Sequence, residues 1–516
     1  QIEQQGGEDW LDQHLRNNGF EPIRLDGRDP ASIAWGIHTI EARLQACIAA
    51  ERAEPNAHHR IPLRYGIAET IKGYGFPGAG SNAAHNLPLP GNPSKDEAAR
   101  DLFNSGSAAL FVPEAVLRAA IQDLSTHAAQ NRPQEKDHWL ALRQVAPPQL
   151  PAPQWYDRDA ECSPMVALDQ QFVAILDANP GLRARVGNPD ELRSNKLEHT
   201  LDLLKHRVQD PEQGISESRT GGVITALNEE AVVCAAFGNK GGINLVVTYE
   251  AFATKMLGAM RQELIFARQK AEAGHAPGWL SVPVVLTSHT WENAKNEQSH
   301  QDPTLSEAML GEMGDTAPVR FPADANCAMA MLSNCYGRHG QIITLVVPKR
   351  PLPVRFDAVQ AAELAERGVV LLDGDPASAA LLLIATGAYQ LGVVERALER
   401  LTQRGIVSAL IYVGEPGRLR RPRDGREAAY VLDDIEVQKL FPPGQPRVFV
   451  THTRPEPYLG LLRRIDTGPA TTCALGYINR GGTLDVEGLL FANRCTWAHA
   501  VDAAAALMGL DRSRLL

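Results

Sequence analysis

Short apolar runs rich in β-branched residues alternate with helical stretches through residues 160–516, and this alternation constrains the fold more than any other feature. Residues 282–288 (VPVVLTS) and 341–348 (QIITLVVP) have the composition of buried strands. The same kind of run returns three times nearer the carboxyl terminus, at 380–387, 406–413 and 446–453. Strands that alternate with helices, such as the helical patterns over 251–273 and 389–404, predict an α/β fold built on parallel sheets.

The charge balance and the apolar runs argue against two classes of partner. Lysine and arginine number 51 against 61 aspartates and glutamates, which gives a formal charge of -10. Generic nucleic-acid binding needs a basic surface, so we expect no nucleic-acid partner. The longest apolar runs fall far short of the roughly 20 residues of a membrane span, so we expect no membrane association. The first ten residues are neither basic nor apolar, unlike a signal peptide.

The number and spacing of the cysteines indicate the redox state of the cellular compartment. There are seven of them, an odd number, and none forms a CxxC pair. This usage predicts neither a disulfide framework nor a zinc site. A reducing cytoplasm is the expected location.

A proline-dense stretch divides the chain. Residues 144–155, QVAPPQLPAPQW, are typical of a semi-extended linker. We therefore predict an amino-terminal segment over 1–143, the linker over 144–159, and two further domains over 160–355 and 356–516.

The amino-terminal segment contains a glycine pattern that resembles a nucleotide-binding turn. A helix is predicted over 31–51 and a strand over 60–71, with no recognisable strand ahead of the helix. Gly73-Tyr-Gly75-Phe-Pro-Gly78 then matches GxGxxG. A dinucleotide site needs the last glycine to open a helix, whereas a long Gly/Pro-rich loop follows here. The pattern therefore predicts a structured loop that delivers His85 into a site.

The densest polar segment, residues 288–303, directly follows a predicted buried strand. Loops at the carboxyl ends of strands are where α/β proteins place their chemistry, although a solvated surface loop remains the alternative. His289 and His300 could be metal ligands, but their eleven-residue spacing favours structural histidines.

Glu229 and Glu230 precede the apolar run AVVCAAFG, and two interpretations stay open. A carboxylate that leads into an apolar stretch can be buried with a raised pKa. Alternatively, both glutamates lie in the first turn of a helix that Asn228 caps. The second interpretation can hold for Glu230 while Glu229 is functional.

Several short motifs, in collinear order, together resemble one family. They are GFEPIRLDGRDP (19–30), AAHNLPLP (83–90), NPDELRSNKL (188–197), LNEE…YEAF (227–252), SHQDP (299–303) and PADAN (322–326). This set resembles the thiamine-diphosphate-dependent phosphoketolases, and TIKGYG (70–75) is similar to transketolases. The resemblance runs through nearly the whole chain.

The resemblance implies a transketolase-like architecture with thiamine diphosphate and Mg²⁺ as cofactors. Its three α/β domains would be the tail of a diphosphate-binding domain (1–143), a pyrimidine-binding domain (160–355) and a carboxyl-terminal domain (356–516). The family's GDG…Asn motif, which holds the metal, would lie ahead of residue 1, so no metal ligand is expected on this chain. A homodimer, or an assembly with a chain that carries the diphosphate-binding half, is implied.

The resemblance also assigns roles to individual residues. The catalytic candidates are Glu229, His85, His300 and His289. The cofactor candidates are Glu229, Tyr249, Phe252 and Asp190. The substrate candidates are Ser194, Asn296 and Lys349. A carboxylic acid at Glu229 would stand beside the aminopyrimidine ring and favour the tautomer that accepts a proton.

The chain departs from the family at three positions next to SHQDP. Glu292 stands where the family has Arg, Asn293 where it has Gln, and Lys295 where it has His. A change from Arg to Glu reverses the charge that an anionic substrate would meet. The implied activity is phosphoketolase-like cleavage of a C–C bond in a sugar phosphate or related ketose, with inorganic phosphate as a co-substrate. The alternatives are a transketolase, a 2-oxo acid decarboxylating component, or a non-catalytic subunit.

Overall fold

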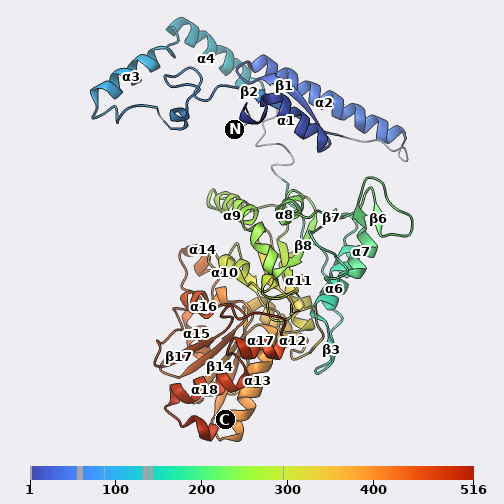
Figure 1. The fold of residues 1–516 in the computed structure, drawn as a ribbon, viewed down its shortest axis with the longest axis vertical. Coiled ribbons are helices and arrows are strands. Elements are labelled where there is room, and N and C mark those ends of the chain that lie inside the picture. Colours follow the sequence, from blue (N-terminus) through green and yellow to red (C-terminus); the bar gives the residue numbers. More distant parts are fainter. Residues whose placement is uncertain are drawn as a thin grey trace. The chain divides into compact units, whose positions relative to one another are not determined.

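The computed structural model describes residues 3–54, 62–86, 88–131, 138, 143–294 and 296–515 (Figure 1). The chain divides into two compact units, Gln1–Gln134 and Glu135–Leu516. None of the described helices is long and apolar enough to cross a membrane.

Unit 1 is built on a pair of parallel strands, β1 (Phe20–Asp26) and β2 (Leu63–Glu69), joined by the long helix α2 (Pro30–Ala53). Asp29 caps α2 by accepting from the amide of Ala31, and Pro30 occupies its first turn. The sequence predicted no strand before this helix, and that prediction is wrong. Strand β1 is not recognisable as an apolar run, because charged residues and Pro22 interrupt it. Within this strand only Pro22 and Ile23 are buried.

The glycine-rich stretch after β2 is a loop that leads into the short 3₁₀ helix η2 (Asn82–His85). Gly73, Gly75 and Gly78 all have positive φ angles, a conformation that side chains disfavour. No α-helix opens at Gly78, which fits the prediction of a structured loop rather than a dinucleotide-binding turn. Unit 1 is completed by η1 (Glu3–Gln5), α1 (Gly7–Asn17), α3 (Glu97–Ala108) and α4 (Glu114–Ala129).

The first sheet of unit 2 has eight strands in the order β10-β11-β9-β8-β4-β7-β5-β6, and all of its pairings are parallel. Its strands are β4 (Ala184–Asn188), β5 (His206–Arg207), β6 (Glu217–Ser218), β7 (Val223–Thr225), β8 (Ile243–Tyr249), β9 (Val282–Thr287), β10 (Val319–Arg320) and β11 (Ile342–Val346). Its helices are α6 (Pro164–Ala178), α7 (Glu198–Leu204), α8 (Glu229–Phe237), α9 (Leu257–Glu272), α10 (Thr304–Leu310) and α11 (Ala325–Tyr336), with the 3₁₀ helices η4 (Glu250–Met256) and η5 (Gln298–His300).

The second sheet of unit 2 has five strands in the order β13-β15-β14-β16-β17, with the edge strand β13 antiparallel to the rest. Its strands are β13 (Val369–Asp373), β14 (Leu381–Thr386), β15 (Ser408–Val413), β16 (Arg447–Thr451) and β17 (Thr472–Leu475). The helices α13 (Ala388–Gln403) and α18 (Trp497–Met508) pack against each other and against this sheet. The predicted α/β fold with parallel sheets is confirmed.

Short elements join and flank the two sheets of unit 2. Strands β3 (Glu161–Cys162) and β12 (Leu352–Pro353) form an antiparallel pair. The others are α12 (Ala358–Arg367), η6 (Pro416–Leu419), α14 (Gly425–Ala428), α15 (Asp434–Leu440), α16 (Pro455–Leu461), α17 (Val486–Ala492) and α19 (Arg512–Leu515).

The two sheets of unit 2 share one hydrophobic core. A single cluster of buried side chains contains Phe172 and Val285 near the first sheet together with Leu383 and Val450 of the second. A fully buried ion pair, Arg320 Nε to Glu415 Oε2 at 2.8 Å, joins the same two regions. The proposed boundary between 160–355 and 356–516 therefore passes between two sheets whose side chains pack together.

Gly187 in β4 lies against the helix that carries Glu229. A Cβ atom at residue 187 would come within 2.6 Å of the carbonyl oxygen of Val232, which is backbone of α8 and cannot swing away. We expect Gly187→Ala to push α8 off the sheet and to lower the free energy of unfolding by about 1–3 kcal/mol, as overpacking does. Denaturant unfolding followed by circular dichroism measures this change.

Gly392, in the middle of α13, is the matched control because a Cβ there would meet no atom within 4 Å. Gly392→Ala should raise stability by about 0.5–1 kcal/mol, since alanine is the better helix former. Equal effects of the two substitutions would contradict the close contact between β4 and α8.

Candidate active site

The candidate residues of unit 2 gather at one edge of the first sheet. Strands β11, β9, β8 and β4 are neighbours and run parallel, so their carboxyl ends meet at the same edge. Asp190 follows β4, Tyr249 ends β8, His289 follows β9 and Lys349 follows β11. Buried polar atoms at the same strand ends, Asn188 Oδ1, Thr287 Oγ1 and Ser288 Oγ, have no hydrogen-bond partner within the described chain. Such atoms are typical of an edge that receives a ligand or water.

Glu229 and Glu230 occupy the first turn of α8, which Asn228 caps by accepting from the amide of Ala231. The capping interpretation is therefore correct for both glutamates, but their surroundings differ. Glu229 is only 7% exposed, whereas Glu230 is exposed. Lys255 Nζ lies 3.0 Å from Glu229 Oε1, and its own side chain is 63% exposed, so the pair can open without disturbing the core.

Asp190 stands close to Glu229 and forms a second carboxylate in the same place. Burial raises the pKa of Asp190, and the nearby charge of Glu229 raises it further. The hydroxyl of Thr248 donates to Asp190 at 3.4 Å. A carboxyl group such as Asp190, whose ionisation is disfavoured by burial and by a neighbouring charge, is a common feature of sites that hold and move protons.

Tyr249 and Phe252 form an aromatic platform beside these carboxylates. Their ring centroids are 6.0 Å apart and their planes differ by 21°. The imidazole of His300 meets Phe252 edge-on at 4.8 Å, and Lys255 Nζ lies 5.3 Å from the same ring. A flat heteroaromatic group could stack here while it reaches a carboxylate.

Ser194 and Lys349 approach the platform from its other end. Ser194 Oγ lies 3.2 Å from the hydroxyl of Tyr249, and Lys349 Nζ lies 5.3 Å from the Tyr249 ring. Burial lowers the pKa of Lys349, and the charge of Glu292 acts most strongly against this effect. The structure thus brings two of the three predicted substrate residues close to Tyr249.

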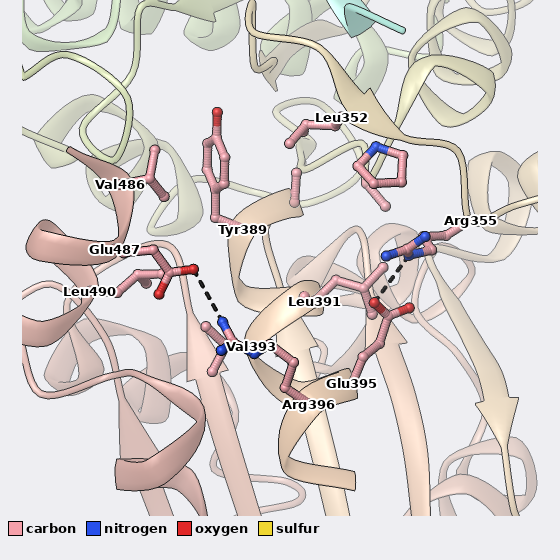
Figure 2. A pocket seen from close by; sticks show the side chains of 14 residues that line it. Leu352, Arg355, Tyr389, Leu391, Val393, Glu395, Arg396, Val486, Glu487 and Leu490 are labelled. Atoms are coloured by element: carbon pink, nitrogen blue, oxygen red, sulfur yellow. Dashed lines mark hydrogen bonds and ion pairs between the residues drawn. The ribbon is translucent and has the colours of Figure 1, made fainter. Parts of the chain in front are cut away.

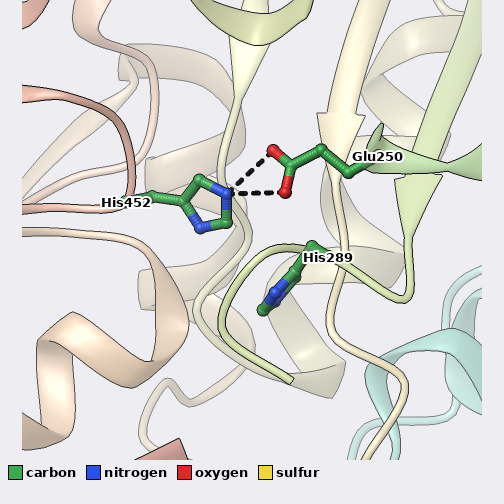
Figure 3. A group of neighbouring side chains, drawn as sticks. All are labelled: Glu250, His289 and His452. Carbon is green, nitrogen blue, oxygen red and sulfur yellow. Dashed lines mark hydrogen bonds and ion pairs between the residues drawn. The ribbon is translucent and has the colours of Figure 1, made fainter. Parts of the chain in front are cut away.

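A buried carboxylate and two buried imidazoles lie behind this platform (Figure 3). Glu250 accepts from the amide and the hydroxyl of Thr290, both at 2.8 Å, and from Nε2 of His452 at 2.9 and 3.1 Å. Burial alone would raise the pKa of Glu250, but His452 and the donors around it hold it below its usual value. Burial lowers the pKa of His289, whose ring meets that of His452 at right angles.

Sequence reasoning missed Glu250 and His452. Glu250 stands within the YEAF motif next to Tyr249, and His452 directly follows the buried strand β16. A polar residue at the end of an apolar strand was the available signal for His452. The two residues are 202 positions apart, so only the fold shows that they pair.

Three further predicted positions need separate mention. His85 lies in unit 1, where Lys72 Nζ is 3.0 Å from its Nδ1 and where it lines a cavity of about 420 Å³ with Gly73 and Pro88. Asn296 is exposed on the loop after β9, and its carbonyl accepts from Ser299 Oγ. Lys295 lies outside the described residues.

Glu292 is only 3% exposed and binds three donors. Its Oε1 accepts from the amide of Lys349 at 2.9 Å, and its Oε2 accepts from the amide of Arg350 at 3.3 Å. The hydroxyl of Tyr389 donates to Oε2 at 2.9 Å. Glu292 therefore ties the loop after β9 to the loop after β11 and to helix α13.

A neighbouring cavity of about 230 Å³ contains Tyr389 in its wall (Figure 2). Its charged lining residues are paired, Arg355 with Glu395 at 3.0 Å and Arg396 with Glu487 at 3.2 Å. Most of the remaining lining is aliphatic. This cavity therefore presents little that would bind or activate a polar substrate.

Among the residues that the structure describes, Glu250, His289 and His452 are the one set of three potential ligands whose atoms lie within 4.8 Å of one another. Mg²⁺ prefers oxygen ligands and keeps several waters, so a buried set with two imidazoles does not suit it. We place no Mg²⁺ in this cluster.

Comparison with known proteins matches this site to one family. Residues 166–338 match the family D-xylulose 5-phosphate/D-fructose 6-phosphate phosphoketolase. The stretch includes Asp190, Glu229, Tyr249 and the loop after β9. Over this stretch the chain is similar to the phosphoketolases. Its relatives include a probable phosphoketolase of Synechococcus elongatus, 24% identical over 479 residues, or 85% of this chain and 58% of that protein. Another, from Streptomyces avermitilis, is 24% identical over 92% of this chain and 63% of its own length.

Solved structures agree on the fold of this phosphoketolase-like chain. Transketolase from Leishmania mexicana matches with a TM-score of 0.63 and 16% identity, over 97% of this chain and 68% of that one. A transketolase mutant from Pichia stipitis matches with a TM-score of 0.66 and 17% identity, over 98% and 69%. The transketolase-like architecture is confirmed. The chain spans about three fifths of the length of the two curated relatives, 58% and 63%.

Proposed function

We propose that this chain is the pyrimidine-binding and carboxyl-terminal part of a thiamine-diphosphate-dependent enzyme that cleaves a C–C bond next to the ketone of a ketose, as a phosphoketolase does. The observation that carries the proposal is the buried carboxylate of Glu229, next to Asp190 and to the platform of Tyr249 and Phe252. A transketolase, a 2-oxo acid decarboxylating component and a non-catalytic subunit are the alternatives.

The residues present fit the aminopyrimidine end of the cofactor. A flat heteroaromatic ring can stack on Phe252, while Glu229 shares a proton with a ring nitrogen and Asp190 lies close by. When bound, thiamine diphosphate supplies the nucleophilic carbon that attacks the ketone. Mg²⁺ and the diphosphate would be held by groups other than the Glu250 cluster.

The chain's own side chains would then move protons and orient the ketose. His300, edge-on to Phe252, and His289 are the proposed proton carriers. The neutral imidazole that burial favours at His289 can accept a proton as readily as it donates one. Ser194 and Lys349 would orient the far end of the substrate, with Asn296 and His85 as further candidates.

A second chain forms part of this proposal, either in a homodimer or as the carrier of the diphosphate-binding half. Within the described part of unit 1 the sheet has two parallel strands, although parallel sheets are normally covered on both faces by further elements. Large apolar side chains on α2 and α4 are exposed: Ile33, Trp35, Ile37, Leu44, Val116, Leu117, Ile121 and Leu124. Patches of this kind mark interaction surfaces.

A cytoplasmic location is proposed as well. The seven cysteines are all free thiols, as a reducing compartment allows.

Product analysis separates the candidate activities. We expect the chain, combined with a diphosphate-binding partner, thiamine diphosphate and Mg²⁺, to convert a ketose and inorganic phosphate into acetyl phosphate, a shorter aldose and water. Coupled assays and mass spectrometry measure both products.

Other outcomes of the same assay point to the alternatives. Transfer to an aldose acceptor without any need for phosphate would indicate a transketolase. Release of CO₂ from a 2-oxo acid would indicate a decarboxylating component. If there is no turnover and calorimetry detects no cofactor binding, the chain is a non-catalytic subunit.

A further inference from the structure

The carboxylate of Glu292 occupies an anion-binding arrangement of backbone amides from the same chain. The amides of Lys349 and Arg350 are consecutive, and both donate to the Glu292 carboxylate, at 2.9 and 3.3 Å. Successive backbone N–H groups that converge on one point are a common way to hold a phosphate or sulfate. Here the anion is a side chain of the same chain.

A third donor completes the arrangement. The hydroxyl of Tyr389, at the start of α13, donates to Glu292 Oε2 at 2.9 Å. Burial and the charge of Glu292 raise the pKa of Tyr389 far above its usual value, so its hydroxyl remains a donor. With three donors satisfied and 3% of its surface exposed, Glu292 cannot readily leave this place.

The charge of Glu292 also acts on Lys349, a cation of the candidate substrate site. Among the charges near Lys349, that of Glu292 does most to keep its ammonium group protonated, and Asp190 acts in the same direction. The guanidinium of Arg350 donates back to the carbonyl of Glu292 at 2.9 Å. Lys196 and Arg350 add positive charge near Lys349, and the carboxylates of Glu292 and Asp190 oppose it.

We infer that Glu292 sets the substrate class of the site: the ketose whose far end reaches Lys349 is uncharged there and carries hydroxyl groups rather than a phosphate. This inference rests on the proposed function. The backbone donors of Lys349 and Arg350 that could have held a phosphate are occupied by the Glu292 carboxylate, whose charge disfavours a second anion beside it. A sugar hydroxyl can bond to Lys349 and to Ser194 without that penalty.

The first test measures anion binding and needs no turnover. Inorganic sulfate is titrated by calorimetry into the full chain and into its Glu292→Gln and Glu292→Ala variants. We expect the wild-type chain to bind sulfate no better than Glu297→Gln, an exposed change in the same loop. Removal of the negative charge should improve sulfate affinity by at least about tenfold, the scale of one charge-assisted hydrogen bond. Equal sulfate binding by all four proteins would overturn the inference.

The second test uses the assembled enzyme and compares kcat/KM for a ketose and for its terminally phosphorylated form. We expect the wild type to prefer the unphosphorylated ketose, and Glu292→Gln to shift the ratio toward the phosphorylated one by at least about tenfold. Tyr389→Phe removes a hydrogen bond but keeps the charge, so it should leave the ratio unchanged. A wild-type preference for the phosphorylated ketose would overturn the inference.

The two tests fail in different ways. If no ketose is turned over, the proposed function fails, while the sulfate titration still decides whether Glu292 excludes anions. If Glu292→Ala does not fold because three donors lose their acceptor, the nearly isosteric Glu292→Gln keeps both tests open.

Discussion

Glu229→Gln is expected to lower kcat/KM of the assembled enzyme by about 10²- to 10⁴-fold, the usual contribution of a positioned acid or base. The amide keeps the size of the side chain but cannot relay a proton to the ring nitrogen of the cofactor. Folding should survive, because the substitution is nearly isosteric and the lost partner, Lys255, is largely exposed. Steady-state kinetics and thermal unfolding of the same preparation measure both effects.

Glu230→Gln is the matched control. It stands in the same first turn of α8, has the same chemistry and is exposed, so it should leave kcat/KM nearly unchanged. If Glu230→Gln is inactive while Glu229→Gln is active, the match of LNEE to the family is off by one residue. If both variants are fully active, the proposal that this site uses thiamine diphosphate is wrong.

Glu250→Ala is expected to lower the free energy of unfolding by about 3–5 kcal/mol, the cost of removing one partner of a buried charged pair. The change leaves the amide and hydroxyl of Thr290 and Nε2 of His452 without their acceptor. The loop after β9, which carries His289 and His300, should then exchange its amide hydrogens faster. Denaturant unfolding measures the stability, and hydrogen-exchange mass spectrometry of the loop measures the local effect.

Glu272→Ala provides the comparison for this loss. Glu272 lies near the end of α9 and pairs with Arg268 at 3.2 Å while its own side chain is 59% exposed. Its removal should change stability by no more than about 0.5 kcal/mol. An unchanged unfolding midpoint and unchanged exchange in Glu250→Ala would mean that the pair with His452 does not form in solution.

Buried strands were the most predictable part of this fold. β9, β11, β14, β15 and β16 are short, largely apolar runs that include β-branched residues, and such runs are recognisable without any knowledge of their neighbours. β1 is different, because charged residues interrupt its sequence and only Pro22 and Ile23 are buried. Its pairing with β2 is a property of the whole unit, which no local pattern encodes.

The first turn after β8 illustrates a smaller difference. The sequence predicted one helix over 251–273, whereas the chain forms the 3₁₀ helix η4 and then α9. η4 begins at Glu250, whose side chain is held by Thr290 and His452. Tertiary hydrogen bonds therefore help to determine the 3₁₀ geometry of this segment, which the periodicity of the sequence does not distinguish from an α-helix.

Candidate site residues at the ends of neighbouring strands could be predicted from the sequence. Contacts between residues of the two sheets could not. Asp190, Tyr249, His289 and Lys349 follow strands of one sheet, and motif order was enough to group them. Tyr389 and His452 belong to the second sheet, far along the chain. Their contacts with Glu292 and Glu250 depend on how the two sheets pack, which sequence spacing does not report.

The core that both sheets share determines which piece of this chain could be exchanged with a relative. A junction between residues 355 and 356 would separate Arg320 from Glu415, and Trp291 from the His452 carbonyl to which it donates. The side chains of a carboxyl-terminal segment from another protein would not be complementary to the first sheet. In a close-packed core, even small differences in side-chain volume lower stability. Recombination at that junction would therefore disrupt a closely packed interior, and we expect the two sheets of unit 2 to be exchangeable only as one piece.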